Sequence, residues 1–168
     1  AKATFVKDPN QAAVLMESAQ RVTQEALEDI RRSVAALRNP VDDHVPLEEQ
    51  VRNLLKNAES KGIKSTLEVI GEIRDLDTKV FMTLFRIVQE GVNNVCKHSH
   101  ATEMRVKIDY SVGHMIQLEI SDNGIGADHF DGGFGLIGLK ERIQYVDGKL
   151  NISSSVGKGF KITATLPG

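Results

Sequence analysis

The sequence predicts an α+β fold, a two-layer sandwich of helices on a mixed, mostly antiparallel sheet, preceded by one long helix. Apolar residues recur every three or four positions along residues 8–37, 46–58 and 81–95, which is typical of amphipathic helices. The period changes to two along residues 104–110 and 116–120, as expected of strands with one buried face. Helices that accompany an antiparallel-rich sheet pack on it as a second layer.

Length and composition indicate one globular domain, or one domain plus an appendage. The chain has 168 residues, of which 40% are hydrophobic and 26% are charged. Its formal net charge of −2 argues against a nucleic-acid partner, because phosphate binding needs clustered surplus Lys and Arg. The single cysteine, Cys96, leaves no internal disulfide and fits a reducing compartment, so we expect a cytoplasmic location.

No apolar run in the sequence is long enough to cross a bilayer. We therefore expect no membrane contact by this segment. The first residues show no sign of a natural N-terminus, which leaves open a longer parent protein that is anchored in the inner membrane.

The first 40 residues read as one long helix. Asp8 can cap it, and Asn39-Pro40 ends it. Its apolar stripe must be covered by another element, and we favour a partner helix. The chain therefore divides into a helical appendage, residues 1–40, and a domain, residues 41–168.

Two further helices and a strand are predicted before the hairpins. Pro46 opens the first of these helices, and Gly62 is placed to end it. Residues 65–72 read as a strand, and Asp77 or Thr78 can cap the helix that follows.

Two hairpins complete the predicted sheet. The first joins the alternating stretches 104–110 and 116–120 through a turn at Gly113. The second joins strands near 149–155 and 160–166. A glycine-dense loop and a helix lie between the two hairpins.

A line of polar residues follows one side of the helix that precedes the first hairpin. Glu90, Asn94 and Lys97 fall within about 60° of one another on a helical wheel, opposite the apolar face. A solvated stripe is the simplest interpretation. Against it, Asn93-Asn94 are poor helix formers with no turn nearby to justify them. A carboxylate, an amide and an ammonium group in this order also suit a nucleotide and its Mg²⁺.

Two glycine-bearing motifs follow. In "SDNGIGAD" a strand delivers Asp122, whose carboxylate can accept a hydrogen bond from the exocyclic amine of adenine. Gly124 and Gly126 allow the backbone to approach a planar ligand, although a plain Asp-Asn-Gly turn explains the same residues. In "DGGFGLIGLKERI" glycines lead into a helix whose free N–H groups can hold phosphate.

The histidines do not indicate a zinc site. His98 and His100 point to different sides of a helix, and no cysteine pair or acidic cluster completes a ligand shell. His98 is better explained as the end of the polar line.

In order and spacing, these stretches resemble the catalytic and ATP-binding part of sensor histidine kinases, which has the Bergerat ATP-binding fold shared with gyrase-type and Hsp90-type ATPases. "RIVQEGVNNVCKHSHA" is similar to the N box of that family, "SDNGIGAD" to its G1 box and "GGFGLIGLKERI" to its G2 box. "GKGFKITATLP" resembles the final glycine turn and strand. "EDIRRSVAALR" resembles the second helix of the dimerisation hairpin in the branch whose response regulators have helix-turn-helix output.

The resemblance implies a role for each matched residue. Glu90 would polarise the attacking histidine, and Asn94 would coordinate Mg²⁺. Lys97, together with His98, would contact phosphate, and Asp122 would read adenine. The other implied nucleotide-binding residues lie in the two glycine loops: Gly124, Gly126, Gly133, Gly135 and Leu136. The implied function is transfer of the γ-phosphoryl group of Mg-ATP to a histidine, for relay to a response regulator by a homodimeric parent kinase.

Two departures from the family pattern carry expectations of their own. The family's phosphoaccepting histidine lies on the preceding helix, and residues 1–40 contain no histidine. We therefore expect a fragment that binds ATP but needs the histidine-bearing hairpin of its parent for phosphorylation. Phe160 stands where the family usually has Thr, which predicts altered or weakened recognition of adenine.

Other functions fit parts of the sequence. An anti-sigma-type serine kinase shares the fold and a similar N box but has no reason to carry the long helix. An ATP-hydrolysing machine of the gyrase or Hsp90 class would need further domains. A non-catalytic nucleotide-sensing module is disfavoured by the intact Glu90. The sequence therefore favours a protein-histidine kinase.

Overall fold

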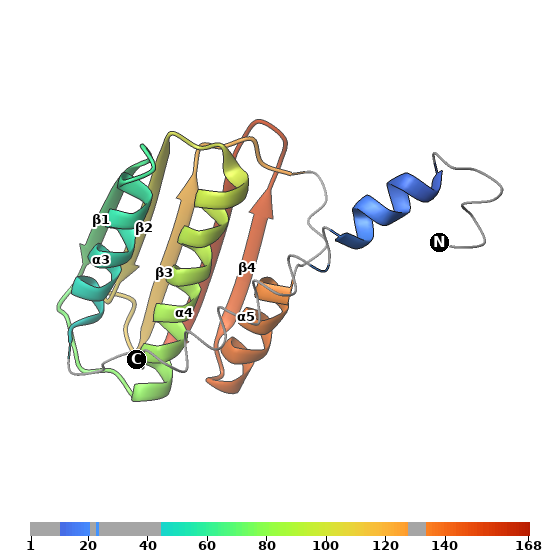
Figure 1. The fold of residues 1–168 in the computed structure, drawn as a ribbon. Coiled ribbons are helices and arrows are strands. Elements are labelled where there is room, and N and C mark those ends of the chain that lie inside the picture. Colours follow the sequence, from blue (N-terminus) through green and yellow to red (C-terminus); the bar gives the residue numbers. More distant parts are fainter. Residues whose placement is uncertain (1–10, 21–22, 24–44, 128–133) are drawn as a thin grey trace. The chain divides into compact units, whose positions relative to one another are not determined.

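The computed structural model describes residues 11–20, 23, 45–127 and 134–168. The chain divides into two compact units, Ala1–Val41 and Asp42–Gly168. Residues 11–20 are helical, and the rest of the long helix predicted there, apart from Thr23, lies outside the described residues (Figure 1). None of the helices in the described ranges is both long and apolar enough to span a membrane.

The second unit is a two-layer α+β sandwich, as the sequence predicts. Three helices of its described residues cover one face of the sheet (Figure 1): α3 (Leu47–Glu59), α4 (Thr78–Asn94) and α5 (Phe134–Tyr145). The strands are β1 (Lys64–Ile70), β2 (Glu103–Asp109), β3 (Met115–Asp122), β4 (Lys149–Ser154) and β5 (Phe160–Pro167). Their order in the sheet is β1-β2-β3-β5-β4. Only β1 and β2 pair in parallel within this five-stranded sheet, which is therefore mixed and mostly antiparallel.

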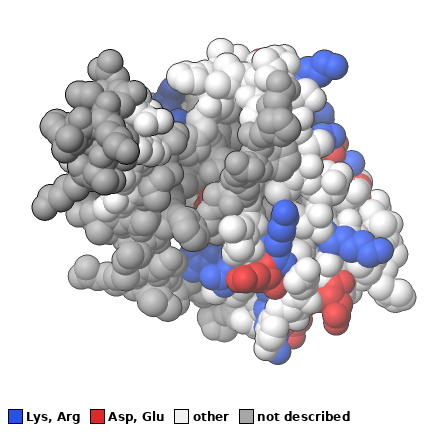
Figure 2. All heavy atoms as spheres, turned by 90° about the vertical axis from the view of Figure 1, so that its right-hand side faces the viewer, with Lys and Arg blue, Asp and Glu red and all other residues white. Residues whose placement is uncertain are grey.

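The core lies between the helices and the three central strands. Alternate strand residues point towards the helices and are buried: Met104, Val106, Ile108, Ile116, Leu118, Ile120, Ile162, Ala164 and Leu166. The other strand face carries cross-strand ion pairs, such as Lys161 with Glu119 at 2.9 Å. On the face of the molecule in Figure 2, Lys and Arg are interspersed with Asp and Glu among the described residues.

Helix α4 packs directly on the centre of the sheet. Asp77 caps it, as predicted, by accepting the backbone N–H of Lys79 at 2.8 Å. The apolar side predicted from the helical wheel is buried. At Gly91 a Cβ would lie 2.7 Å from Cδ1 of Ile120 on β3, so a larger residue would push the helix away from the sheet.

The end of α4 differs from the predicted continuous α-helix. Val95–Ser99 form a π-helical turn, and His100 follows with a φ of 52° in the left-handed region. The hydroxyl of Ser99 donates to the carbonyl of Val95 at 2.8 Å and accepts the N–H of Ala101 at 3.0 Å. These two bonds stabilise the wide turn, since they satisfy backbone groups that the α-helix no longer pairs.

The wide turn changes where the last polar residues lie. A π-helical turn advances through fewer degrees per residue than an α-helix. Lys97 and His98 lie on this turn and are exposed, so the angular spacing of a regular α-helix does not apply to them.

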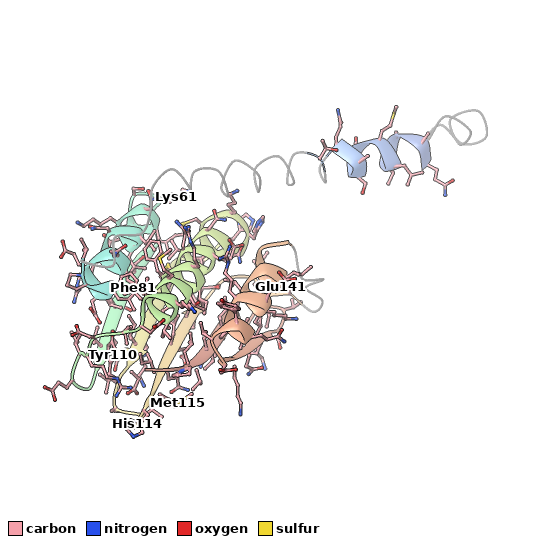
Figure 3. All side chains as sticks on the ribbon, turned by 90° about the horizontal axis from the view of Figure 1, so that it is seen from below. Lys61, Phe81, Tyr110, His114, Met115 and Glu141 are labelled. Carbon is pink, nitrogen blue, oxygen red and sulfur yellow. The ribbon has the colours of Figure 1, made fainter. Side chains whose placement is uncertain are left out.

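A buried polar pair joins α3 to the end of β2. The hydroxyl of Tyr110 donates to a carboxylate oxygen of Glu48 at 2.5 Å, and the two side chains are only 4% and 7% exposed. Figure 3 shows Tyr110 at this end of the sheet, near Phe81 of α4. Burial raises the pKa of Tyr110, and the bond to Glu48 raises it further. The phenol therefore stays protonated and remains a donor at neutral pH.

Tyr110→Phe is expected to lower the free energy of unfolding by roughly 1–3 kcal/mol, because it leaves the Glu48 carboxylate buried without its donor. The chain's other tyrosine gives a matched control. Tyr145 is 74% exposed, and Tyr145→Phe keeps the ring that lies 5.4 Å from the ammonium of Lys79, so its effect should stay within about 0.5 kcal/mol. Urea unfolding measures both, and equal small losses would show that the buried pair contributes nothing.

Candidate nucleotide site

Strand β3 ends at Asp122, where the chain turns sharply. The Asp122 carboxylate accepts the backbone N–H of Gly124 at 2.7 Å and also the backbone N–H of Phe160. Burial raises the pKa of Asp122, and the two backbone hydrogen bonds oppose that rise. An ionised carboxylate accepts through about four lone-pair positions. Asp122 is therefore held in place and still has capacity to accept a hydrogen bond from a ligand.

The turn after Asp122 packs against the end of the π-helical turn. A Cβ at Gly124 would lie 2.1 Å from the carbonyl oxygen of Ser99. Only glycine, which has no Cβ, avoids this overlap. The next residue, Ile125, donates its backbone N–H to the same carbonyl at 2.8 Å. The strand end that carries Asp122 and the turn that follows Asn94 are therefore in direct contact.

Two more glycines close the turn on its other side. A Cβ at Gly126 would lie 2.0 Å from the carbonyl oxygen of Ser155, and a Cβ at Gly159 would lie 1.9 Å from that of Asp122. Both glycines have positive φ, 61° and 73° respectively. The β4–β5 turn thus packs closely against the backbone from Asp122 to Gly126.

Glu90 on α4 lies against the first turn of α5. A Cβ at Gly135 would lie 2.0 Å from one carboxylate oxygen of Glu90. The first N–H groups of a helix have no intrahelical partner and carry partial positive charge, so a carboxylate is favourable there. Gly135 leaves the space that the Glu90 carboxylate occupies.

The polar line on α4 is not a solvated stripe. Glu90 and Asn94 are half-buried, and Thr83, which the wheel places near that line, is buried. Helix α5 packs beside α4 and covers this side. Arg86 approaches Arg142 of α5, and burial lowers the pKa of Arg86, which the charge of Arg142 lowers further.

The predicted site residues thus form two groups, each with contacts among its own members. The described contacts join Glu90 to Gly135, and they join Asp122 to Gly124. Leu136 is buried in the first turn of α5. Gly133 lies outside the described residues. Lys97 and His98 are exposed.

Residues that the sequence did not single out also shape the site. Gly159 and the Ser99 carbonyl contact the Asp122 turn as closely as the predicted glycines do. The signal for Gly159 was present in the "VGKG" turn, which precedes Phe160. Nothing in the sequence marks a backbone carbonyl such as that of Ser99.

The oxygen donors near the end of α4 suit Mg²⁺. In the part of the chain that the structure describes, no three His, Cys, Asp or Glu residues cluster as they would to hold a metal ion by protein ligands alone. Mg²⁺ keeps several waters and usually takes one or two protein oxygens together with substrate phosphates. The Asn94 amide oxygen is a ligand of that kind, so it fits this ion.

Comparison with known proteins gives a consistent result. The profile of a family described as histidine kinase-, DNA gyrase B-, and HSP90-like ATPase matches residues 79–168. The signal transduction histidine-protein kinase/phosphatase UhpB of Salmonella typhimurium is 32% identical over 158 residues, which cover 90% of this chain and 31% of that protein. The corresponding protein DegS of Brevibacillus brevis is 31% identical over 152 residues, with 88% of this chain and 39% of that protein covered.

Solved structures show the same fold at lower identity. The histidine kinase AdeS of Acinetobacter baumannii superposes with a TM-score of 0.60 at 18% identity, over 99% of this chain and 85% of that one. At this identity the likeness speaks for the fold alone. The chain spans less than two fifths of the length of the two curated relatives, 31% and 39%.

Proposed function

Since the chain belongs to the family of histidine kinase-, DNA gyrase B- and HSP90-like ATPases and is a catalytic, ATP-binding domain of the histidine kinase type, we propose that it transfers the γ-phosphoryl group of Mg-ATP to a histidine of a separate helical hairpin. One observation carries the proposal. The Glu90 carboxylate of α4 lies at Gly135, in the first turn of the helix that follows the second glycine loop. The acidic group is therefore beside the start of the helix over which the phosphates would lie.

The adenine end of the nucleotide would lie at Asp122. Its carboxylate would accept a hydrogen bond from the exocyclic amine, which distinguishes adenine from guanine. Gly124 and Gly126 would let the ring approach the backbone. Phe160 occupies the position of the usual Thr, and only its backbone N–H is bonded to Asp122, so its side chain would meet the base as an apolar surface.

The triphosphate would lie along the end of α4. Asn94 would hold Mg²⁺, which neutralises charge on the phosphates when it is bound. Lys97 and His98 are exposed on the π-helical turn, and their side chains would contact the phosphate oxygens. Gly133, Gly135 and Leu136 would contribute the backbone that covers the phosphates.

Catalysis would depend on positioning and charge rather than on covalent steps by the protein. We propose that Glu90 accepts a hydrogen bond from one ring N–H of the attacking histidine. The other ring nitrogen then keeps its lone pair directed at the γ-phosphorus. The leaving group is ADP, and the histidine becomes phosphorylated.

The proposal extends to the parent protein. Residues 1–40 would be the second helix of a dimerisation hairpin, and residues 41–168 the catalytic domain of a homodimeric sensor kinase. Its phosphohistidine would supply a response regulator with helix-turn-helix output. We propose a cytoplasmic location for this domain, because ATP would be its substrate and its single cysteine is free.

Asp122→Asn should separate binding from stability. Because burial raises the pKa of Asp122, its ionisation costs stability as the pH rises through that pKa. The amide keeps an oxygen to accept the N–H of Gly124 but carries no charge. We expect the variant to be as thermally stable as wild type at pH 7, or more stable. Any difference in stability between the two should narrow towards pH 4. Mg-ATP binding by the variant should be roughly 10–100-fold weaker than by wild type. A stability loss of the same size as the binding loss would contradict this.

A transfer assay tests the proposed function. The chain is mixed with radiolabelled Mg-ATP and the separately purified histidine-bearing hairpin of the parent kinase. The proposal predicts an acid-labile, base-stable phosphate on the hairpin. An acid-stable phosphate on a partner protein would favour the serine kinase, and tight ATP binding without any transfer would favour the nucleotide-sensing module.

A further inference from the structure

Asn123 lies between Asp122 and Gly124 but has a different set of contacts. Its side-chain oxygen accepts two backbone N–H groups, from Thr102 at 3.0 Å and from Glu103 at 2.9 Å. Its side-chain nitrogen donates to the hydroxyl of Thr102 at 2.9 Å, and its backbone N–H donates to the carbonyl of Glu103 at 3.2 Å. Four hydrogen bonds therefore tie this one residue to the start of β2.

These bonds begin where the sheet pairing stops. The register between β2 and β3 ends with Met104 opposite Asp122. Beyond that pair the Asn123 side chain takes the place of the next strand partner for Thr102 and Glu103. The contact between the two segments is thus extended by one backbone bond, from Asn123 to Glu103, and by the Asn123 side chain.

The segment held by Asn123 follows directly on the π-helical turn. Ser99 ends that turn, and its carbonyl accepts the N–H of Ile125 at 2.8 Å. Asn123 and Ile125, one on each side of Gly124, therefore form hydrogen bonds with residues in the segment 99–103. Since Asn94 immediately precedes the turn, these hydrogen bonds fix the end of α4 relative to the end of β3.

We propose that Asn123 is a positioning residue that couples the two halves of the nucleotide site. It would touch neither base nor phosphate. It would instead set the distance between Asp122, which binds adenine, and the turn that carries the phosphate-binding side chains. This inference rests on the proposed ATP site, and it concerns how the two ends of the ligand reinforce each other.

The test compares two ligands, adenosine and Mg-ATP. In Asn123→Ala the bonds of Asp122 to Gly124 and Phe160 remain, so adenosine affinity should stay within about twofold of wild type. Mg-ATP affinity should fall roughly 10–100-fold, as is typical when a residue that orients a ligand-binding group is lost. The ratio of the two affinities is the diagnostic quantity, because general loosening of the fold lowers both.

Two further variants sharpen the test. Thr102→Val removes only the acceptor of the Asn123 side-chain nitrogen and should reduce the affinity ratio by a smaller factor than Asn123→Ala. Asn151→Ala removes an exposed asparagine from β4 and should leave the ratio unchanged. All variants are compared well below their melting temperatures, with adenosine followed by ligand-observed NMR and Mg-ATP by calorimetry.

The outcomes distinguish the coupling from the site itself. A selective loss of Mg-ATP affinity in Asn123→Ala supports the proposal. Equal losses for both ligands, or wild-type affinities for both, overturn it while leaving the ATP site standing. Wild type that binds neither ligand overturns the proposed function, and the coupling with it.

Discussion

Glu90→Gln is expected to slow phosphoryl transfer to the histidine-bearing hairpin roughly 10²–10⁴-fold, with Mg-ATP affinity within about twofold of wild type. The amide is nearly the same size as the carboxylate, so the contact with Gly135 can remain. It is, however, a weaker acceptor and cannot stabilise the positive charge that develops on the attacking imidazole. The loss should therefore appear in the transfer rate and not in binding.

Single-turnover transfer at saturating Mg-ATP measures this effect. Glu141→Gln is the matched control. Glu141 is exposed on α5 (Figure 3), and its substitution removes the same charge from a neighbouring helix. Its transfer rate should equal that of wild type. If both variants slow transfer alike, the effect is one of net charge, and Glu90 has no special part in the reaction.

Gly159→Ala is expected to be among the most destabilising single changes in the domain. Its φ of 73° is unfavourable for alanine by roughly 1–2 kcal/mol. In addition its Cβ would lie 1.9 Å from the backbone oxygen of Asp122, which cannot move without shifting the end of β3. We expect a total cost above about 4 kcal/mol, together with loss of Mg-ATP binding.

Gly157 provides a control that distinguishes the backbone strain of a positive φ from the steric overlap of an added Cβ. It lies in the same turn with a φ of 74°, but a Cβ there meets nothing within 4 Å. Gly157→Ala should therefore show only the backbone cost, roughly 1–2 kcal/mol, and should bind Mg-ATP normally. Denaturant unfolding of the two variants gives the comparison, and equal destabilisation would show that the β4–β5 turn is not fitted to Asp122.

The fold was largely predictable because its elements have clear periods. The change from a step of three or four to a step of two marks the first hairpin, and the buried apolar residues of β2 and β3 are those that alternate. Asp77 begins α4 as its side chain predicts. These are local signals, and tertiary packing did not override them.

The candidate site residues could be selected from the sequence, whereas their contacts could not be derived from it. Glu90 and Asp122 could be selected because they belong to motifs whose order and spacing resemble those of a known family; each carboxylate taken alone also fits a solvated helix side or a plain turn. The π-helical turn at Val95–Ser99 could not, since it depends on the Ser99 hydroxyl competing for backbone groups. The role of Asn123 was also invisible, because its partners Thr102 and Glu103 are distant in sequence.

Titration calorimetry with Mg-ATP tests the central claim most directly, namely that Asn94 and Asp122 serve one nucleotide. Wild type should bind, and Asn94→Ala and Asp122→Ala should each bind at least roughly tenfold more weakly. Asn94→Ala should lose the dependence on Mg²⁺, whereas Asp122→Ala should lose the preference for ATP over GTP. Wild type that binds Mg-ATP no more tightly than either variant would contradict the account.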